Sequence, residues 1–287
     1  MKLIDVIKGE KPSLSFEVFP PKTWDSYESV KSATEEIARL SPSYMSVTYG
    51  AGGGTSDYTL AIAENIKSSF GVTPMAHLTC VSSSKVEVKR QLGRLRDAGI
   101  ENILALRGDI PADFDRSRME YRYAAELVED VRAFGGFCIG GACYPEGHPE
   151  SATSMEDIRH LKEKIDRGCE FLTTQMFFDN NVLYNFLYRI REAGIRVPVV
   201  AGIMPVTNPK QIRRICSICG AALPQRFVRI MERYGESPEA MRQAGIAYAT
   251  EQIIDLYANG VNAVHVYSMN RPDVAAAIQN NISEILK

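Results

Sequence analysis

The sequence has no long apolar run and no strong excess of either charge. Its 33 lysines and arginines nearly balance 35 aspartates and glutamates, giving a formal net charge of −2. Nothing in that balance draws the chain toward nucleic acid or an anionic membrane. No apolar run approaches the roughly 18 residues of a membrane span, and the start of the chain lacks the apolar core of a signal peptide. We therefore expect a soluble, cytoplasmic protein.

Clustered metal ligands and common nucleophile motifs are also missing. The four histidines, His77, His148, His160 and His265, are scattered. No His-x-His follows the first apolar run, which disfavours a metal-dependent hydrolase barrel, and we expect no metal. There is no serine nucleophile elbow. Among six cysteines the only close pair is Cys216-x-x-Cys219, and such a lone pair indicates ordinary reduced thiols.

Short apolar runs alternate with amphipathic segments along all 287 residues. Nearly continuous apolar runs are typical of parallel strands covered by helices, whereas Val88, Leu92 and Leu95 between two of the runs recur at helical spacing. We predict eight strands, at Leu14–Phe19, Tyr44–Tyr49, Thr73–Cys80, Asn102–Leu106, Phe137–Tyr144, Glu170–Phe177, Val197–Ile203 and Asn262–Tyr267.

Helix boundaries agree with this division. Ser84-x-x-Glu87 and Ser154-x-x-Asp157 are typical of capping boxes. Glycine ends several predicted helices just before a strand, at Gly99, Gly168, Gly194 and Gly260.

Polar residues near successive strand ends recur about every 30 residues, beginning with Glu17, Thr48, His77 and Arg107. Eight strand–helix units of that length predict a single (β/α)8 barrel, an α/β fold. A doubly wound open sheet is the alternative. The long seventh connection predicts one extra helix around Pro224–Arg233. Without a linker or a shift in composition, we expect one domain over residues 1–287.

Chemistry in such barrels sits where strands end. The polar residues there are Glu17, Thr48, Tyr49, His77, Thr79, Arg107, Asp109, Tyr144, Glu146, His148, Gln175, Tyr267, Asn270 and Arg271. Glu17 lies inside the apolar run SFEVF, where an unpaired charge is costly, so we expect it to be neutral, paired or functional.

Three further features have two interpretations each. His77 is either a core imidazole or part of a site. The Gly50–Thr55 loop is either a flexible turn or a backbone that approaches a planar or phosphate-bearing ligand closely. Arg107 could hold a ligand phosphate or pair with Asp109.

Together, these strand-end strings resemble the bacterial 5,10-methylenetetrahydrofolate reductase family. The matching segments are Ser15–Pro21 (SFEVFPP), Ser46–Gly50 (SVTYG), Ala76–Cys80 (AHLTC), Ala105–Pro111 (ALRGDIP), Tyr144–Glu150 (YPEGHPE), Thr174–Asp179 (TQMFFD) and Gly202–Pro205 (GIMP). They extend over nearly the whole chain, in order. The family's fold is also a (β/α)8 barrel.

The resemblance implies a flavoenzyme that passes a hydride from NADH or NADPH to flavin and then to methylenetetrahydrofolate. It implies that Glu17 is the general acid that opens the one-carbon bridge of the folate. Asp109 would orient the pterin and tune the flavin. Gln175 would contact substrate, and Gln211 and Arg271 would contact nicotinamide or folate.

The resemblance also implies a site for FAD, with FMN as the alternative. The matching positions are Thr48, His77, Arg107, Gly108, Asp109, Tyr123, Ala142, Tyr144, His148, Asp157 and Lys164. Two positions depart from the pattern: His160 and Glu163 stand where Asn and Arg are common in the family.

We expect small-molecule substrates and a homo-oligomer. A partner subunit is compatible with the sequence. Because the chain ends at Lys287, we expect it to lack the C-terminal regulatory domain of the eukaryotic enzymes. A flavin-free, pterin-binding methyltransferase barrel and a non-catalytic scaffold subunit are the alternative functions.

Overall fold

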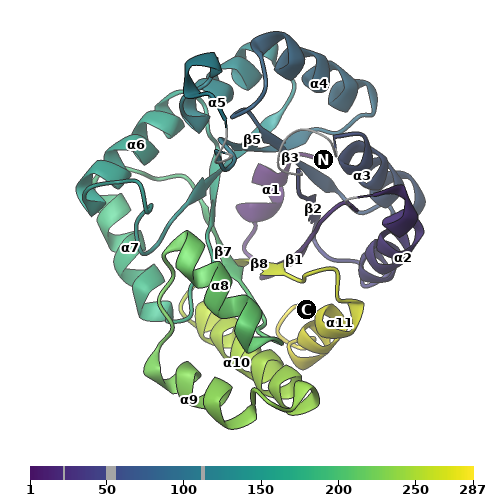
Figure 1. Cartoon of the computed structure of the whole chain (residues 1–287), viewed down its shortest axis with the longest axis vertical. Coiled ribbons are helices and arrows are strands. Elements are labelled where there is room, and N and C mark those ends of the chain that lie inside the picture. Colours follow the sequence, from purple (N-terminus) through teal and green to yellow (C-terminus); the bar gives the residue numbers. More distant parts are fainter. Residues whose placement is uncertain (22, 50–55, 111–113) are drawn as a thin grey trace.

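Eight parallel strands close into a barrel around which the helices form a ring (Figure 1). The computed structural model describes residues 1–21, 23–49, 56–110 and 114–287. Each strand pairs with the next along the chain, and the last pairs with the first through Phe16 and Val266. That closing pair confirms the predicted (β/α)8 barrel over the open sheet. The Gly50–Thr55 loop and Pro111 lie outside the described residues.

All eight predicted strands are present, most of them shorter than their apolar runs. The strands are β1 (Ser13–Val18), β2 (Met45–Val47), β3 (Pro74–Thr79), β4 (Asn102–Leu106), β5 (Cys138–Cys143), β6 (Phe171–Thr174), β7 (Val199–Ile203) and β8 (Ala263–Tyr267). The largest difference is in β6, where the run to Phe177 stays buried after the strand ends at Thr174. An apolar run in the sequence indicates which residues are buried, whereas the end of a strand depends on backbone hydrogen bonding to the neighbouring strand.

Helices fill the connections. They are α1 (Leu3–Ile7), η1 (Trp24–Ser26), α2 (Tyr27–Ala38), α3 (Ser56–Phe70), α4 (Lys85–Asp97), η2 (Arg116–Arg118), α5 (Ala124–Phe134), α6 (Ser154–Asp166), α7 (Asn180–Glu192), α8 (Pro209–Cys219), α9 (Gln225–Tyr234), α10 (Pro238–Ala258) and α11 (Pro272–Asn281). The seventh connection holds three of them. The predicted extra helix is α9, and α8 is a second one that the sequence analysis did not predict.

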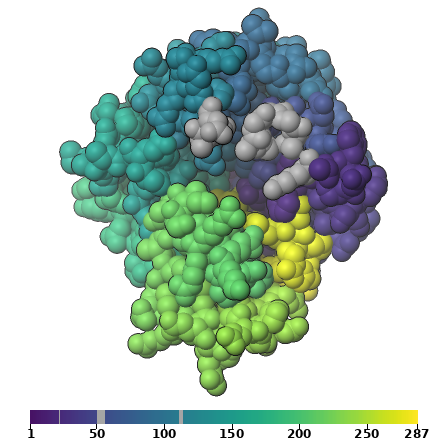
Figure 2. All heavy atoms as spheres, viewed as in Figure 1, coloured from purple at the N-terminus to yellow at the C-terminus, as the bar shows by residue number. Residues whose placement is uncertain are grey.

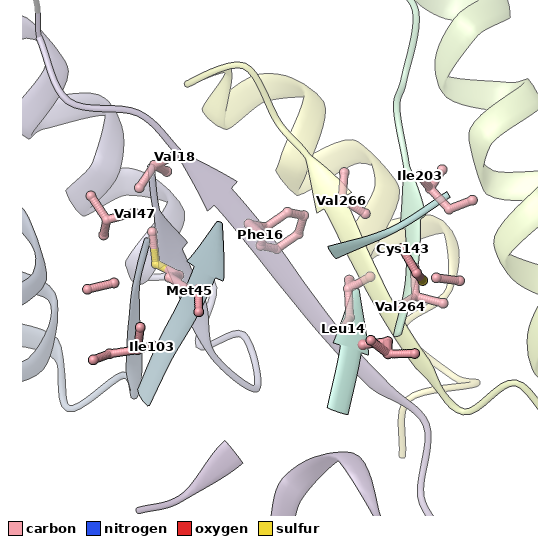
Figure 3. Packing of buried hydrophobic residues seen from close by; sticks show 14 of the residues in the cluster. Leu14, Phe16, Val18, Met45, Val47, Ile103, Cys143, Ile203, Val264 and Val266 are labelled. Carbon is pink, nitrogen blue, oxygen red and sulfur yellow. The ribbon is translucent and has the colours of Figure 1, made fainter. Parts of the chain in front are cut away.

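Side chains alternate between the two faces of each strand. Leu14, Phe16 and Val18 of β1 join the apolar layer between strands and helices, together with Val264 and Val266 of β8 (Figure 3). A separate apolar cluster contains two residues of α1, the residue just before β2 and one residue from each strand from β3 to β8. These residues are Leu3, Ile7, Tyr44, Met75, Leu104, Cys138, Phe171, Val200 and Ala263. Figure 1 shows α1 in the middle of the ring, so this short helix closes one end of the barrel.

Helix ends follow the predicted capping chemistry with one correction. The Ser84 hydroxyl accepts a hydrogen bond from Glu87 N at 3.2 Å, as predicted. At α6, however, the cap is Thr153 rather than Ser154, since its hydroxyl accepts from Glu156 N at 3.2 Å. The four predicted helix-ending glycines all have positive φ, of 67°, 127°, 82° and 79° in chain order, which is the conformation that a side chain disfavours.

Candidate active site

Above the apolar cluster, the barrel interior is polar. The His265 ring lies between two serine hydroxyls, with Nδ1 2.8 Å from Ser15 Oγ and Nε2 2.9 Å from Ser46 Oγ. It also stacks on the Tyr44 ring at 5.5 Å. Only 1% of His265 is exposed. A buried imidazole held on both nitrogens is a fixed polar group, since each nitrogen already has a partner.

Glu17 lies directly beside this group. In the strand register it stands between Ser46 of β2 and Tyr267 of β8. Its Oε2 is 3.5 Å from His77 Nε2 and 3.9 Å from His265 Nε2, and 21% of its side chain is exposed. The carboxyl therefore faces two imidazoles inside the barrel while remaining open to the mouth. The isolated charge in an apolar run is explained by this polar interior.

His77 occupies the other side of Glu17 and has an orphaned atom. Its ring is 7% exposed, and Nε2 is buried with no hydrogen-bond partner among the described residues. Burial lowers the pKa of His77 to about 4, against an opposing effect of Glu17. The ring is neutral near pH 7, so the His77–Glu17 contact is not an ion pair there.

That lowered pKa makes stability depend on pH. The unfolded chain takes up a proton at His77 near its ordinary value of 6.5, whereas the native ring does so only near 4. We expect the free energy of unfolding to fall between pH 7 and pH 5, with about 1–2 kcal/mol of the fall due to this group. Urea unfolding of the wild type and His77→Gln at both pH values measures it. An equal fall in both proteins would contradict the assignment.

Two strand ends are locked together beside Glu17. The Asn270 side chain accepts from Phe19 N and donates to Phe19 O, both at 2.9 Å, and the Ser268 hydroxyl donates to Glu17 O at 2.6 Å. Met269 and Asn270 both have positive φ, near 53°, a region that non-glycine residues other than Asn and Asp rarely adopt. This turn holds β1 and β8 in a fixed position and leads into Arg271, whose guanidinium pairs with Asp273 at 3.0 Å.

Gln175 follows β6 on the same side of the barrel. Its backbone N donates to Cys143 O at 2.7 Å, and its side-chain oxygen accepts from Met176 N at 2.9 Å. The carboxamide is therefore oriented by the backbone next to it and by the Tyr144 side chain, which it also contacts. The phenol of Tyr267 donates to Thr174 O at 2.5 Å, one residue before it.

Arg107 has a partner that the sequence did not predict. Its guanidinium holds Glu150 through two bonds of 2.6 and 2.7 Å, so the suggested partner Asp109 is wrong for this structure. This contact raises the pKa of Arg107 and lowers that of Glu150. Asp109 itself is exposed. Between them, Gly108 has φ of 85°, and a Cβ there would lie 3.2 Å from Thr79 and Val81, so a side chain would be both strained and crowded.

The loop after β5 connects this region to the segment between α8 and α9. The rings of Tyr144 and His148 meet edge-on at 4.6 Å. Burial, more than the nearby Asp109, raises the pKa of Tyr144, and burial lowers the pKa of His148. Glu146 accepts from Ala222 N at 2.8 Å. Figure 2 shows α8 and α9 (green) gathered over one side of this face, and Gln211 is exposed on α8.

A third group lies around α6. Lys164 Nζ donates to Ala142 O at 2.7 Å, and Asp157 accepts from the Ser151 hydroxyl at 3.4 Å. The His160 ring stacks on exposed Tyr123 at 6.1 Å. Glu163, one of the two departures from the family pattern, pairs with Arg167 at 2.7 Å, and the same guanidinium also pairs with Glu129 at 2.7 Å.

The structure thus brings some of the predicted residues together and leaves others apart. Glu17 and His77 are in contact. Gln175 directly follows Thr174, whose carbonyl accepts the hydrogen bond from Tyr267. The backbone N of Thr48 donates to Val18 O, at the end of β1, at 2.9 Å. Gln211 and Tyr123 lie exposed at the periphery. Sequence reasoning missed Ser15, Ser46, His265 and Glu150. The first three carried a signal, because Ser15 and Glu17, Ser46 and Thr48, and His265 and Tyr267 are each two apart and share a strand face.

These residues can be tested for fit to a flavin dinucleotide. Lys164 is bonded to an uncharged carbonyl, so that contact leaves its positive charge available to a diphosphate. His77 Nε2 is an orphaned buried polar atom that a ligand atom could satisfy. Thr48, His77, Arg107 and Tyr144 lie in or just after the successive strands β2, β3, β4 and β5, which agrees with one extended ligand across the ends of these strands. The residues fit the group.

Residues 1–21, 23–49, 56–110 and 114–287 contain no group of three or more His, Cys, Asp and Glu side chains placed to hold a metal ion. Over those same ranges, no helix is both long enough and apolar enough to cross a membrane.

Solved structures with similar folds include an uncharacterized protein from Clostridium thermocellum that binds two copies of 5-methyl-5,6,7,8-tetrahydrofolic acid. It aligns with a TM-score of 0.68 at 14% identity, over 99% of this chain and 98% of its own. An oxaloacetate acetylhydrolase aligns with a TM-score of 0.54 at 11% identity, over 99% of this chain and 84% of its own. At these identities the likeness shows the fold alone.

Sequence comparisons are more specific. The chain is 34% identical to methylenetetrahydrofolate reductase (NADH) 1 of Arabidopsis thaliana, over 99% of this chain but 51% of the plant protein, so it spans about half the length of that relative. It is 35% identical to the 5,10-methylenetetrahydrofolate reductase of Pectobacterium carotovorum, over 93% of this chain and 88% of that protein. The Escherichia coli protein is 33% identical over 93% and 89%. The methylenetetrahydrofolate reductase family model matches residues 2–283, and the chain therefore belongs to the methylenetetrahydrofolate reductase family.

Proposed function

We propose that this protein reduces 5,10-methylenetetrahydrofolate to 5-methyltetrahydrofolate with a bound FAD and electrons from NADH or NADPH. The observation that carries the proposal is Glu17, a carboxyl between two imidazoles in the barrel interior of a member of this family. The methyltetrahydrofolate bound by the Clostridium thermocellum barrel is the same class of ligand as the proposed product. We also propose that residues 1–287 act as one catalytic unit and form a homo-oligomer.

Bound FAD supplies hydride transfer between the nicotinamide and the one-carbon unit of the folate. Thr48, His77, Tyr144 and His148 would hold it along the ends of β2, β3 and β5. Arg107 and Lys164 would face its anionic parts, and Gly108 would allow close approach of the backbone. Tyr123, Ala142, Asp157 and Asp109 complete the proposed set.

Glu17 has the role of acid toward the folate. Its carboxyl donates a proton from the barrel interior to the bridge of the folate, which opens the bridge to a reactive iminium. The His77 ring beside it is neutral near pH 7, so it contacts the carboxyl without forming an ion pair. Asp109, exposed at the end of β4, orients the pterin.

Gln175 acts on both ligands because they share one pocket. Its side-chain oxygen is held by Met176 N. Its amide N–H₂ contacts the Tyr144 side chain, and the second N–H of that group is left to donate to a ligand. Gln211 on α8 and Arg271 after β8 contribute from the connections that follow the neighbouring strands β7 and β8. The nicotinamide would leave before the folate enters.

The proposal is tested on the purified protein after reconstitution with FAD. We expect a yellow protein whose flavin absorption is bleached by NADH or NADPH without oxygen. Methylenetetrahydrofolate should restore the colour with formation of 5-methyltetrahydrofolate. A protein that stays colourless with both FAD and FMN would favour a methyltransferase or a scaffold, and so would one whose bleached flavin is not reoxidised by the folate.

A shared pocket predicts ping-pong kinetics. Double-reciprocal plots of rate against nicotinamide at several folate concentrations should be parallel, and each ligand at high concentration should compete with the other for the same enzyme form. Gln175→Ala should slow both half-reactions, by roughly 3- to 10-fold, because one hydrogen bond to each ligand is lost. Stopped-flow absorbance measures the half-reactions separately. The control is Gln243→Ala, which removes an exposed amide on α10. Intersecting lines, or a loss in only one half-reaction, would contradict the shared pocket.

A further inference from the structure

The Tyr267 side chain crosses the barrel interior from β8 to β6. Its hydroxyl donates to Thr174 O at 2.5 Å. Between these strands lies Gly202 of β7, where a Cβ would be 2.5 Å from the phenol oxygen and 2.7 Å from its ring. The phenol therefore occupies space that any other residue at position 202 would fill. The contact therefore requires both a tyrosine at position 267 of β8 and a glycine at position 202 of β7.

This contact closes a gap in the sheet. The β6–β7 ladder pairs Leu172 with Val199 and Thr173 with Val200. At the next residue of β6 the Thr174 hydroxyl accepts from Gly202 N at 2.8 Å, and Tyr267 takes the Thr174 carbonyl. Side chains thus hold the last residue of β6 beyond the ladder. Burial is the main cause that raises the pKa of Tyr267, so the phenol stays protonated as a donor.

Gln175 is the residue that this anchor fixes. Its backbone follows Thr174 directly and bonds to Cys143 O, and its carboxamide is tied to Met176 N. The side chain is thus a short, constrained extension of the strand end. We infer that Tyr267 is a positioning residue that holds Gln175 at the angle needed to contact ligand. The inference rests on the proposed function, since Gln175 matters only if it contacts folate and nicotinamide.

An effect of Tyr267 on the reaction through Glu17 can be distinguished from an effect through Gln175. Tyr267 is also the register partner of Glu17, and its ring meets the His265 ring edge-on at 5.7 Å. An effect through Glu17 would slow only the folate half-reaction. An effect through Gln175 slows both half-reactions, because Gln175 serves both ligands.

The test is a double-mutant cycle with Tyr267→Phe and Gln175→Ala. We expect Tyr267→Phe to slow both half-reactions by roughly 3- to 10-fold, the range of one lost hydrogen bond. In the Gln175→Ala background the same change should cost less than about twofold, because the residue through which it acts is gone.

Tyr257→Phe is the matched control. Tyr257 is also a buried tyrosine that donates to a backbone carbonyl, Ser13 O at 3.0 Å, at the start of β1 rather than at the end of β6. It should leave both half-reactions unchanged. In hydrogen exchange of the ligand-free protein, Tyr267→Phe should speed exchange of the amides over residues 174–178, and Tyr257→Phe should not.

Each outcome supports or overturns the inference. A full Tyr267→Phe loss that persists without the Gln175 side chain, a loss confined to the folate half-reaction, or unchanged exchange over 174–178 would overturn it. An equal kinetic loss in Tyr257→Phe would do the same. These results leave the proposed function standing, whereas a wild-type protein that cannot reduce methylenetetrahydrofolate removes both.

Discussion

Replacing Glu17 with glutamine is expected to slow reoxidation of the flavin by methylenetetrahydrofolate by about 10²–10⁴-fold, the usual contribution of a positioned acid. Reduction of the flavin by nicotinamide should be largely unchanged. The substitution keeps the shape of the side chain but removes the proton that opens the folate bridge. Because Glu17 faces His77 and His265 at 3.5 and 3.9 Å, an amide of the same size can remain between the two rings.

The measurement is a pair of single-turnover reactions followed at the flavin absorption, with flavin content determined for each preparation. Glu251→Gln serves as control, because this surface carboxylate on α10 pairs only with Arg226 among the described residues. Equal losses in both half-reactions with flavin still bound would mean that Glu17 is not specific to folate activation.

Replacing Arg107 with alanine is expected to weaken flavin binding by roughly 10- to 100-fold. A charge-assisted contact to an anionic ligand is worth about 1.5–3 kcal/mol, and the structure adds a second cause. Arg107 neutralises Glu150 through two short bonds. Its removal leaves that carboxylate unpaired on the same face, where it would repel an anionic cofactor.

Flavin fluorescence titration measures the dissociation constant, and a second substitution separates the two causes. Arg107→Ala with Glu150→Gln should recover part of the affinity, because the uncompensated charge is gone while the direct contact stays lost. Arg226→Ala, which breaks a similar two-bond pair with Glu251 on the outer helices, should leave flavin affinity unchanged. If Arg107→Ala also binds flavin normally, Arg107 is only the structural partner of Glu150.

Local sequence determined the barrel and much of its chemistry. The repeated unit of about 30 residues, the apolar runs and the helix-ending glycines predicted eight strand–helix units in the right order, since they depend on periodicity and backbone conformation within each unit. Glu17 could be selected because a carboxylate in an apolar run needs an explanation wherever that run lies. The same local rules set limits, as the shift of one residue at the α6 cap and the early end of β6 show.

Only the tertiary structure decided which atoms meet. Closure pairs β1 with β8, and so brings Ser15 to within hydrogen-bond distance of His265, 250 residues away. The pairing of adjacent strands places Arg107 against Glu150 rather than its neighbour Asp109, and it lets the Tyr267 phenol pass over Gly202 to Thr174. Strand periodicity tells which face a side chain occupies, but its partner across the barrel depends on register and closure. Those are set by packing of the whole ring of strands and helices.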